Sequence, residues 1–285
     1  MVTRIGRVFA RAAAALLLCL GAAGVPAAMP DIPVPYIPST EVAVEEMLRL
    51  AGVGRNDMVI DLGSGDGRIV IAAARYFGAR GLGVEIDPEL VVVASENARK
   101  AGVADRVRFV AQDALKADIA QATVVTMYLL SPLIERLKPK LLAELKPGTR
   151  IVAHDFGFEG WQPDRKVTIS KTVMLYVVPA RVSGRWRLIA ELPDGRRSFE
   201  FELIQQYQRI DGGARVPGGY LPLFEARLEG DRVRFVIVDN GRSHHFEGRV
   251  DGVVMTGIVR SGIGTAQTEN AWRAERIAHA GRADR

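Results

Sequence analysis

Residues 59–76 read VIDLGSGDGRIVIAAARY, and this stretch decides the fold. An apolar run ends in Asp61, three glycines follow at every second position, and a helix-like segment begins after them. Glycines let the backbone turn sharply and let a ligand approach without a Cβ in the way. The start of the following helix offers free N–H groups and a partial positive charge. The stretch therefore predicts a strand, a ligand-binding turn and a helix, with a carboxylate or phosphate as a suitable ligand.

Strands and helices alternate on both sides of this turn. Short apolar runs predict strands at 58–62, 81–86, 106–113, 122–130 and 149–156, and amphipathic segments predict helices at 41–53, 67–77, 88–102 and 132–148, the last with a break at Pro139. Such alternation is typical of a doubly wound α/β fold with a mostly parallel sheet and right-handed crossovers. Ligands bind at the carboxyl edge of such sheets, where Asp61 ends its strand.

The pattern changes near residue 180, where apolar and polar residues begin to alternate with a period of two. This alternation predicts a small antiparallel β domain over 181–277 with one buried face, followed by a disordered tail, 278–285. His244 and His245 are adjacent, so their side chains point to opposite faces and cannot share a metal ion. The aromatic residues expected in the core of this domain are Trp186, Phe199, Phe201, Phe224, Phe235 and Phe246.

The first 28 residues have a basic start, an apolar run of about 14 residues and a small-residue end. This run is shorter than the roughly 20 residues that span a bilayer, and the order of the three parts is typical of a secretory signal peptide. We therefore expect a signal peptide over 1–28, export to the periplasm or the exterior, and a first domain over 29–180 that opens with a proline-rich segment. A membrane-anchored or cytoplasmic protein remains the alternative.

The charge of the chain gives little support to nucleic-acid binding. The net charge of +5 falls to +2 without the three arginines of the N-terminal segment, and no dense basic block appears later in the sequence. A basic patch or stripe is the usual mark of a nucleic-acid partner. We therefore expect no nucleic acid among the partners.

Acidic residues at two further strand ends narrow the choice of ligand. Arg68 follows the third glycine, so the spacing G-x-G-x-G departs from the G-x-G-x-x-G of dinucleotide sites and disfavours NAD. Glu85 ends the second strand, 24 residues after Asp61, where a carboxylate can accept both hydroxyls of a ribose. Asp113 follows the third strand, where a carboxylate can accept an adenine amino group. All three acids fall on one edge of one sheet.

With these residues in place, residues 33–178 resemble a class I S-adenosyl-L-methionine-dependent methyltransferase. The motif VIDLGSGDGR (59–68) matches that family strongly, and Glu85, Asp113 and LKPGTRIV (145–152) fall at its later motifs. The resemblance implies a seven-stranded sheet, S-adenosyl-L-methionine as cofactor and no metal. It also implies that Glu85 binds the ribose and Asp113 the adenine end. The residues that face the methionine part are Asp61, Gly63, Ser64 and Gly65.

A narrower resemblance concerns the acceptor of the methyl group. VPYIPST (34–40), DLGSGDGRIVIAAA (61–74), VTMYLL (125–130) and GWQPD (160–164) are similar to the ATP synthase c-subunit lysine methyltransferases and their bacterial relatives. The acceptor would be a protein lysine or a small molecule, with a membrane association possible. The β domain after residue 180 lies outside the resemblance.

Two tyrosines are the candidates for the acceptor side of the site. Tyr36 precedes the first helix and Tyr128 follows the fourth strand, and an aromatic ring can hold a lysine amine there. The Asn/Asp-Pro-Pro-aromatic motif of amide and adenine-amine methyltransferases is missing after that strand, which argues against those acceptors. His154 and Asp155, after the fifth strand, are either a base or structural support, and support is favoured.

A second function remains open on the sequence alone. Export motivates it, because the methyl donor is made in the cytoplasm. The chain would then be an exported binding protein, with a catalytically silent methyltransferase-like domain and a β domain that binds a ligand or partner.

Overall fold

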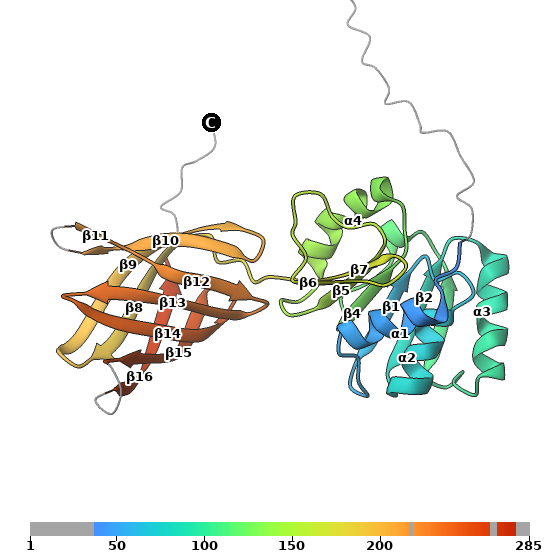
Figure 1. Ribbon diagram of the computed structural model, residues 1–285, viewed down its shortest axis with the longest axis horizontal. Coiled ribbons are helices and arrows are strands. Elements are labelled where there is room, and N and C mark those ends of the chain that lie inside the picture. Colours follow the sequence, from blue (N-terminus) through green and yellow to red (C-terminus); the bar gives the residue numbers. More distant parts are fainter. Residues whose placement is uncertain (1–36, 217–218, 263–266, 278–285) are drawn as a thin grey trace, which may run out of the picture. The chain divides into compact units, whose positions relative to one another are not determined.

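The computed structural model describes residues 37–216, 219–262 and 267–277. Tyr36, the predicted signal peptide and the predicted tail lie outside these residues. Two separate sheets account for all the described strands, one of seven strands and one of nine (Figure 1). No helix within the described ranges is both long and apolar enough to cross a membrane.

The seven-stranded sheet is the methyltransferase sheet that the sequence predicts. Its spatial order is β3-β2-β1-β4-β5-β7-β6. The five strands in the order β3 to β5 are parallel, and β7 runs antiparallel to both of its neighbours. The strands are β1 (Met58–Leu62), β2 (Arg80–Glu85), β3 (Val107–Ala111), β4 (Val124–Met127), β5 (Arg150–His154), β6 (Arg165–Thr168) and β7 (Thr172–Val177). The fold class is therefore confirmed.

Helices cover both faces of this sheet (Figure 1). They are α1 (Glu41–Leu50), α2 (Arg68–Phe77), α3 (Pro88–Lys100) and α4 (Ser131–Glu144), with a short 3₁₀ helix, η1 (Ala114–Lys116). Helices α1 and α2 pack with Val59 and Val124 on one face, whereas α4 packs with Ile60 and Val125 on the other. Adjacent strand residues point to opposite faces, so each of these strands is buried on both sides.

The nine-stranded sheet is antiparallel throughout and has one buried face. Its order is β11-β10-β9-β8-β16-β15-β14-β13-β12, and β10 also lies against β12, so the two ends of the sheet approach each other. The strands are β8 (Gly184–Leu192), β9 (Gly195–Gln206), β10 (Arg209–Val216), β11 (Gly219–Pro222), β12 (Phe224–Glu229), β13 (Arg232–Asp239), β14 (Arg242–Asp251), β15 (Val254–Ser261) and β16 (Thr268–Arg276).

The alternation of the β domain is confirmed with one correction. His244 is buried and the adjacent His245 is exposed, and five of the six aromatic residues lie in the core. The prediction for Phe224 is wrong, because its side chain is 47% exposed. A register shift between Phe224 and Arg227 interrupts the pairing of β12 with β13, and Glu225 adopts a φ of +51° there. A bulge of this kind breaks the period of two from which the prediction was made.

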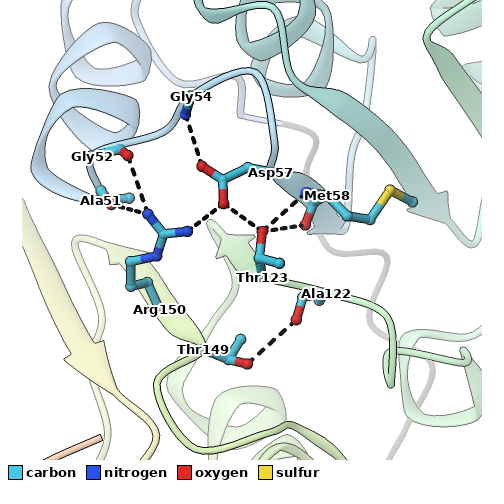
Figure 2. Close-up of polar contacts among 9 residues, drawn as sticks. All are labelled: Ala51, Gly52, Gly54, Asp57, Met58, Ala122, Thr123, Thr149 and Arg150. Carbon is cyan, nitrogen blue, oxygen red and sulfur yellow. Dashed lines mark hydrogen bonds and ion pairs between the residues drawn. The ribbon is translucent and has the colours of Figure 1, made fainter.

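A polar network holds the amino ends of three strands together (Figure 2). This is the edge opposite to Asp61, because Asp61 lies near the carboxyl end of β1. The Asp57 carboxylate accepts hydrogen bonds from Thr123 Oγ1 at 2.6 Å and from the Gly54 N–H at 2.7 Å, and it pairs with the Arg150 guanidinium. Arg150 also donates to the carbonyl of Ala51, just past the end of α1, at 2.8 Å. The network ties α1, β1, β4 and β5 to one another and leaves the opposite edge to the ligand.

Candidate cofactor and acceptor site

Asp61 lies at the carboxyl end of β1, inside the sheet. Its carboxylate accepts a hydrogen bond of 2.7 Å from Thr126 Oγ1, because Asp61 and Thr126 are paired residues of β1 and β4 and share one face. Burial raises the pKa of Asp61 to about 7; the Thr126 hydrogen bond opposes this rise, while the charges of Glu85 and Asp66 add to it. The carboxyl group is therefore poised to change its charge near neutral pH.

The turn after Asp61 is built from residues in left-handed conformations. The φ angles of Gly63, Gly65 and Gly67 are +77°, +52° and +83°. A Cβ on Gly63 would lie 2.7 Å from a methyl carbon of Leu129, and one on Gly67 would lie 2.6 Å from the Phe109 ring. The backbone conformation favours glycine at all three positions, and the Phe109 ring also leaves little room for a Cβ at Gly67.

Glu85 anchors this turn from the end of β2. One carboxylate oxygen accepts from the Gly65 N–H at 2.8 Å, and the other accepts from Ile86 N at 2.8 Å and Asp87 N at 3.1 Å. A carboxylate has about four acceptor positions, so room remains for one further donor. Glu85 thus shapes the loop and retains capacity for one ribose hydroxyl, whereas the sequence suggests that it accepts both.

Ser64 brings an unused polar atom to the turn. Its side chain is buried, and its Oγ has no hydrogen-bond partner among the described residues. A buried polar atom without a partner is unfavourable, and a bound ligand can satisfy it. The turn thus fits S-adenosyl-L-methionine, because it offers a bare backbone, a hydroxyl and a buried carboxylate. Bound there, the cofactor supplies an activated methyl group on a sulfonium.

Asp113 follows β3 on the same edge of the sheet. It is half-buried, and Oδ1 accepts from the Leu115 N–H at 2.9 Å, which caps η1. A hydrogen-bond acceptor near the adenine end is what the resemblance implies for this position. The structure therefore brings Asp61, the glycine turn, Glu85 and Asp113 to the ends of three neighbouring strands.

Tyr128 lies directly after β4, next to the cofactor turn. Its ring packs against the His154 ring with 4.3 Å between centroids, and its hydroxyl accepts a hydrogen bond of 2.6 Å from Lys171 Nζ. Lys171 also pairs with Asp155. Tyr36, the other predicted tyrosine, lies outside the described residues. The candidate acceptor side thus combines the ends of β4 and β5 with the start of β7.

His154 packs against Tyr128 and is held in place by Ser39. The imidazole is buried, and its Nδ1 lies 2.8 Å from Ser39 Oγ. Burial lowers the pKa of His154, with the nearby charges of Asp155 and Lys171 acting in opposite directions. The ring is therefore neutral at pH 7, and it positions the tyrosine without adding charge.

Two residues of the site are missing from the sequence-based prediction. Thr126 binds Asp61 because of the register between β1 and β4, which no local pattern reveals. Lys171 lies in the turn before β7, and only the tertiary fold brings it to Tyr128.

The strand order, the glycine turn and the acids at the strand ends together define a class I methyltransferase. Residues 61–165 match the family model described as ANTKMT methyltransferase domain. A protein-lysine N-methyltransferase from Saccharolobus islandicus is 46% identical over 51% of this chain and 94% of its own length. The mouse ATP synthase c-subunit lysine N-methyltransferase is 37% identical over 48% of this chain and 55% of its own length.

A solved structure is similar over the same part of the chain. It is titled an RNA methyltransferase from Salinibacter ruber in complex with S-adenosyl-L-homocysteine, with 50% identity and a TM-score of 0.51. It is matched over 96% of its length and covers 51% of this chain. The chain belongs to the same family of methyltransferases as the Saccharolobus islandicus enzyme, and S-adenosyl-L-methionine is its methyl donor. These relatives favour an enzyme over the silent binding protein.

Proposed function

We propose that the methyl acceptor is the side-chain amine of a protein lysine. The observation that carries this proposal is the match to the protein-lysine N-methyltransferase of Saccharolobus islandicus over 94% of its length. The site agrees with it in chemistry, because Tyr128 offers a ring and a hydroxyl to an amine. A second relative, the mouse adenine nucleotide translocase lysine N-methyltransferase, is 37% identical over 46% of this chain. Its name also gives a protein lysine as the acceptor.

The main task of the protein in this reaction is to align the acceptor amine with the methyl group. The acceptor amine loses a proton to solvent, its lone pair forms the new C–N bond, and the C–S bonding pair stays on sulfur. The protein must hold the amine in line behind the methyl group at about 3 Å. The buried turn and the ends of β4 and β5 supply the two halves of that alignment.

RNA is the second candidate acceptor, because the similar Salinibacter ruber structure is titled an RNA methyltransferase. The two candidates separate in one experiment. Full-length protein is incubated with radiolabelled S-adenosyl-L-methionine and cell extract, and the label is followed through ribonuclease and protease treatment. We expect label that survives ribonuclease and appears as methyl-lysine after acid hydrolysis. Label confined to RNA would overturn the proposal.

We also propose that residues 1–28 direct export and that the acceptor lies in the cell envelope. The support is the order of basic, apolar and small residues in this segment. Cell fractionation and N-terminal sequencing of the purified protein test it. An intact N-terminus on a cytoplasmic protein would contradict it.

A further inference from the structure

A lysine amine of the chain itself occupies the acceptor side of the site. Lys171 Nζ donates to Tyr128 OH and to Asp155 Oδ2, each at 2.6 Å, and lies 5.1 Å from the centroid of the Tyr128 ring. Tyr128 follows β4, Asp155 follows β5, and Lys171 immediately precedes β7. An ammonium ion donates three hydrogen bonds and is attracted by the face of an aromatic ring. These contacts are the ones that an ammonium group needs.

The surroundings of Tyr128 and Asp155 hold these two side chains in place. The neutral His154 ring packs on Tyr128 and is itself bound to Ser39. Asp155 has a φ of +68°, which is uncommon for a residue other than glycine, and its N–H donates to the Thr172 carbonyl at 2.7 Å. A residue kept in a sparsely populated conformation at a site is a pointer to function.

Lys171 is more exposed to solvent than Asp155. Its side chain is 44% exposed, and an ion pair so open to solvent contributes little to stability. The hydrogen bonds that Lys171 donates to Asp155 and Tyr128 raise the pKa of its amine, so the amine is charged at neutral pH. Another ammonium group could make the same three contacts if it displaced Lys171.

We propose that the Tyr128 hydroxyl and the Asp155 carboxylate bind the ammonium group of the acceptor lysine, and that Lys171 fills this site until the acceptor displaces it. The proposal rests on the proposed function and deepens it. It assigns Asp155 to substrate binding and makes Lys171 an internal competitor of the substrate.

Kinetics of two variants separate this role from a purely structural ion pair. The probe is a ten-residue peptide with one lysine. K171M removes the competitor, so we expect its KM for the peptide to fall about threefold to tenfold with kcat little changed. D155N keeps the shape of Asp155 but loses the charge, so we expect its KM to rise about tenfold or more. If the ion pair were purely structural, both variants would break it and would change KM in the same direction. That result would overturn the proposal.

Amine labelling gives a readout that does not depend on turnover. The enzyme is saturated with S-adenosyl-L-homocysteine and treated with an amine-acetylating reagent, and modification of each lysine is followed by mass spectrometry. We expect the lysine peptide to increase the rate at which Lys171 is labelled. A peptide with arginine in place of lysine should increase this rate less. A labelling rate of Lys171 that is the same with and without the lysine peptide would overturn the proposal.

One control variant and one distinguishing outcome complete the design. Lys166 on β6 is exposed, and K166M should leave KM and the labelling of Lys171 unchanged. Failure of the proposed function has a different signature: no variant transfers methyl groups to the peptide or to any protein, although S-adenosyl-L-homocysteine binds. In that case both the proposed function and the assignment of Asp155 to substrate binding would be wrong.

Discussion

Asp61 is the most deeply buried carboxyl group of the candidate cofactor site. It is 1% exposed, and burial raises its pKa to about 7 from 3.8. The folded protein thus binds this proton more tightly than the unfolded chain does. The contribution of Asp61 to stability is greatest below pH 4 and is lost as the pH rises towards 7. A buried carboxylate kept at this energetic disadvantage is typical of a functional site.

We expect the affinity for S-adenosyl-L-homocysteine to rise about tenfold between pH 6 and pH 8. The charged carboxylate forms in this interval, and the resemblance places it against the methionine part of the ligand, which carries an ammonium group. Asp61→Asn should bind more weakly and lose this pH dependence. Isothermal titration calorimetry at three pH values measures both. Asp105→Asn, at an exposed carboxylate, is the control; an unchanged pH profile in Asp61→Asn would contradict the assignment.

At the scale of elements, the turn between β1 and α2 carries most of the site. The N–H groups of Gly63 and Ser64 both donate to the Val84 carbonyl, at 2.8 and 3.0 Å, so the turn is tied to β2 as well as to β1. Helix α4 shows how packing overrides a local signal. It continues through Pro139, where the sequence predicts a break, because Ile134, Leu137 and Leu141 are buried along one side of it.

Gly65→Arg should abolish binding of S-adenosyl-L-homocysteine. The side chain would project from a left-handed position into the path of the methionine part of the ligand. Gly102→Arg is the matched control, because Gly102 has a φ of +69° and open space around it. Calorimetry and circular dichroism should show two folded variants, of which only the second binds. Normal binding by Gly65→Arg would remove the turn from the site.

The polar network at the amino ends of the strands should affect stability and leave ligand binding unchanged. Arg150→Met removes the partner of Asp57 and the bonds to the end of α1 (Figure 2). We expect the free energy of unfolding to fall by about 2 kcal/mol. The affinity of the folded protein for S-adenosyl-L-homocysteine should not change, because the network lies at the opposite edge of the sheet. Denaturant unfolding tests this, with the exposed Arg55→Met as control; a loss of affinity instead of stability would contradict it.

At the scale of the whole molecule, the hydrophobic cores divide between the two sheets. The fully buried residues of the methyltransferase sheet all precede residue 179, and those of the β domain lie within 180–274. The domain boundary at 180/181 stays a prediction, since separate cores do not by themselves establish independent folding. The Saccharolobus islandicus relative matches over nearly its whole length and covers only 51% of this chain.

A chain of residues 29–180 should therefore fold and bind S-adenosyl-L-homocysteine with an affinity within about threefold of the full-length protein. Its fully buried residues and its glycine turn lie within this range, although Tyr207 also packs on the cluster. Thermal unfolding followed by calorimetry measures the outcome. A truncated chain that is unfolded would show that the β domain stabilises the first domain, and the predicted boundary would be wrong.

The sequence by itself determined the fold class and predicted the cofactor side of the candidate site, because both depend on local patterns. Strand β1 was predicted at its observed bounds, and the glycine spacing and the acids at strand ends are set by the order of residues along the chain. Only the tertiary structure decided the partners of these residues. Thr126 reaches Asp61 through strand register, and Lys171 reaches Tyr128 across 43 positions of the sequence. Contacts of that kind arise from how strands pack side by side, and no short stretch of sequence records them.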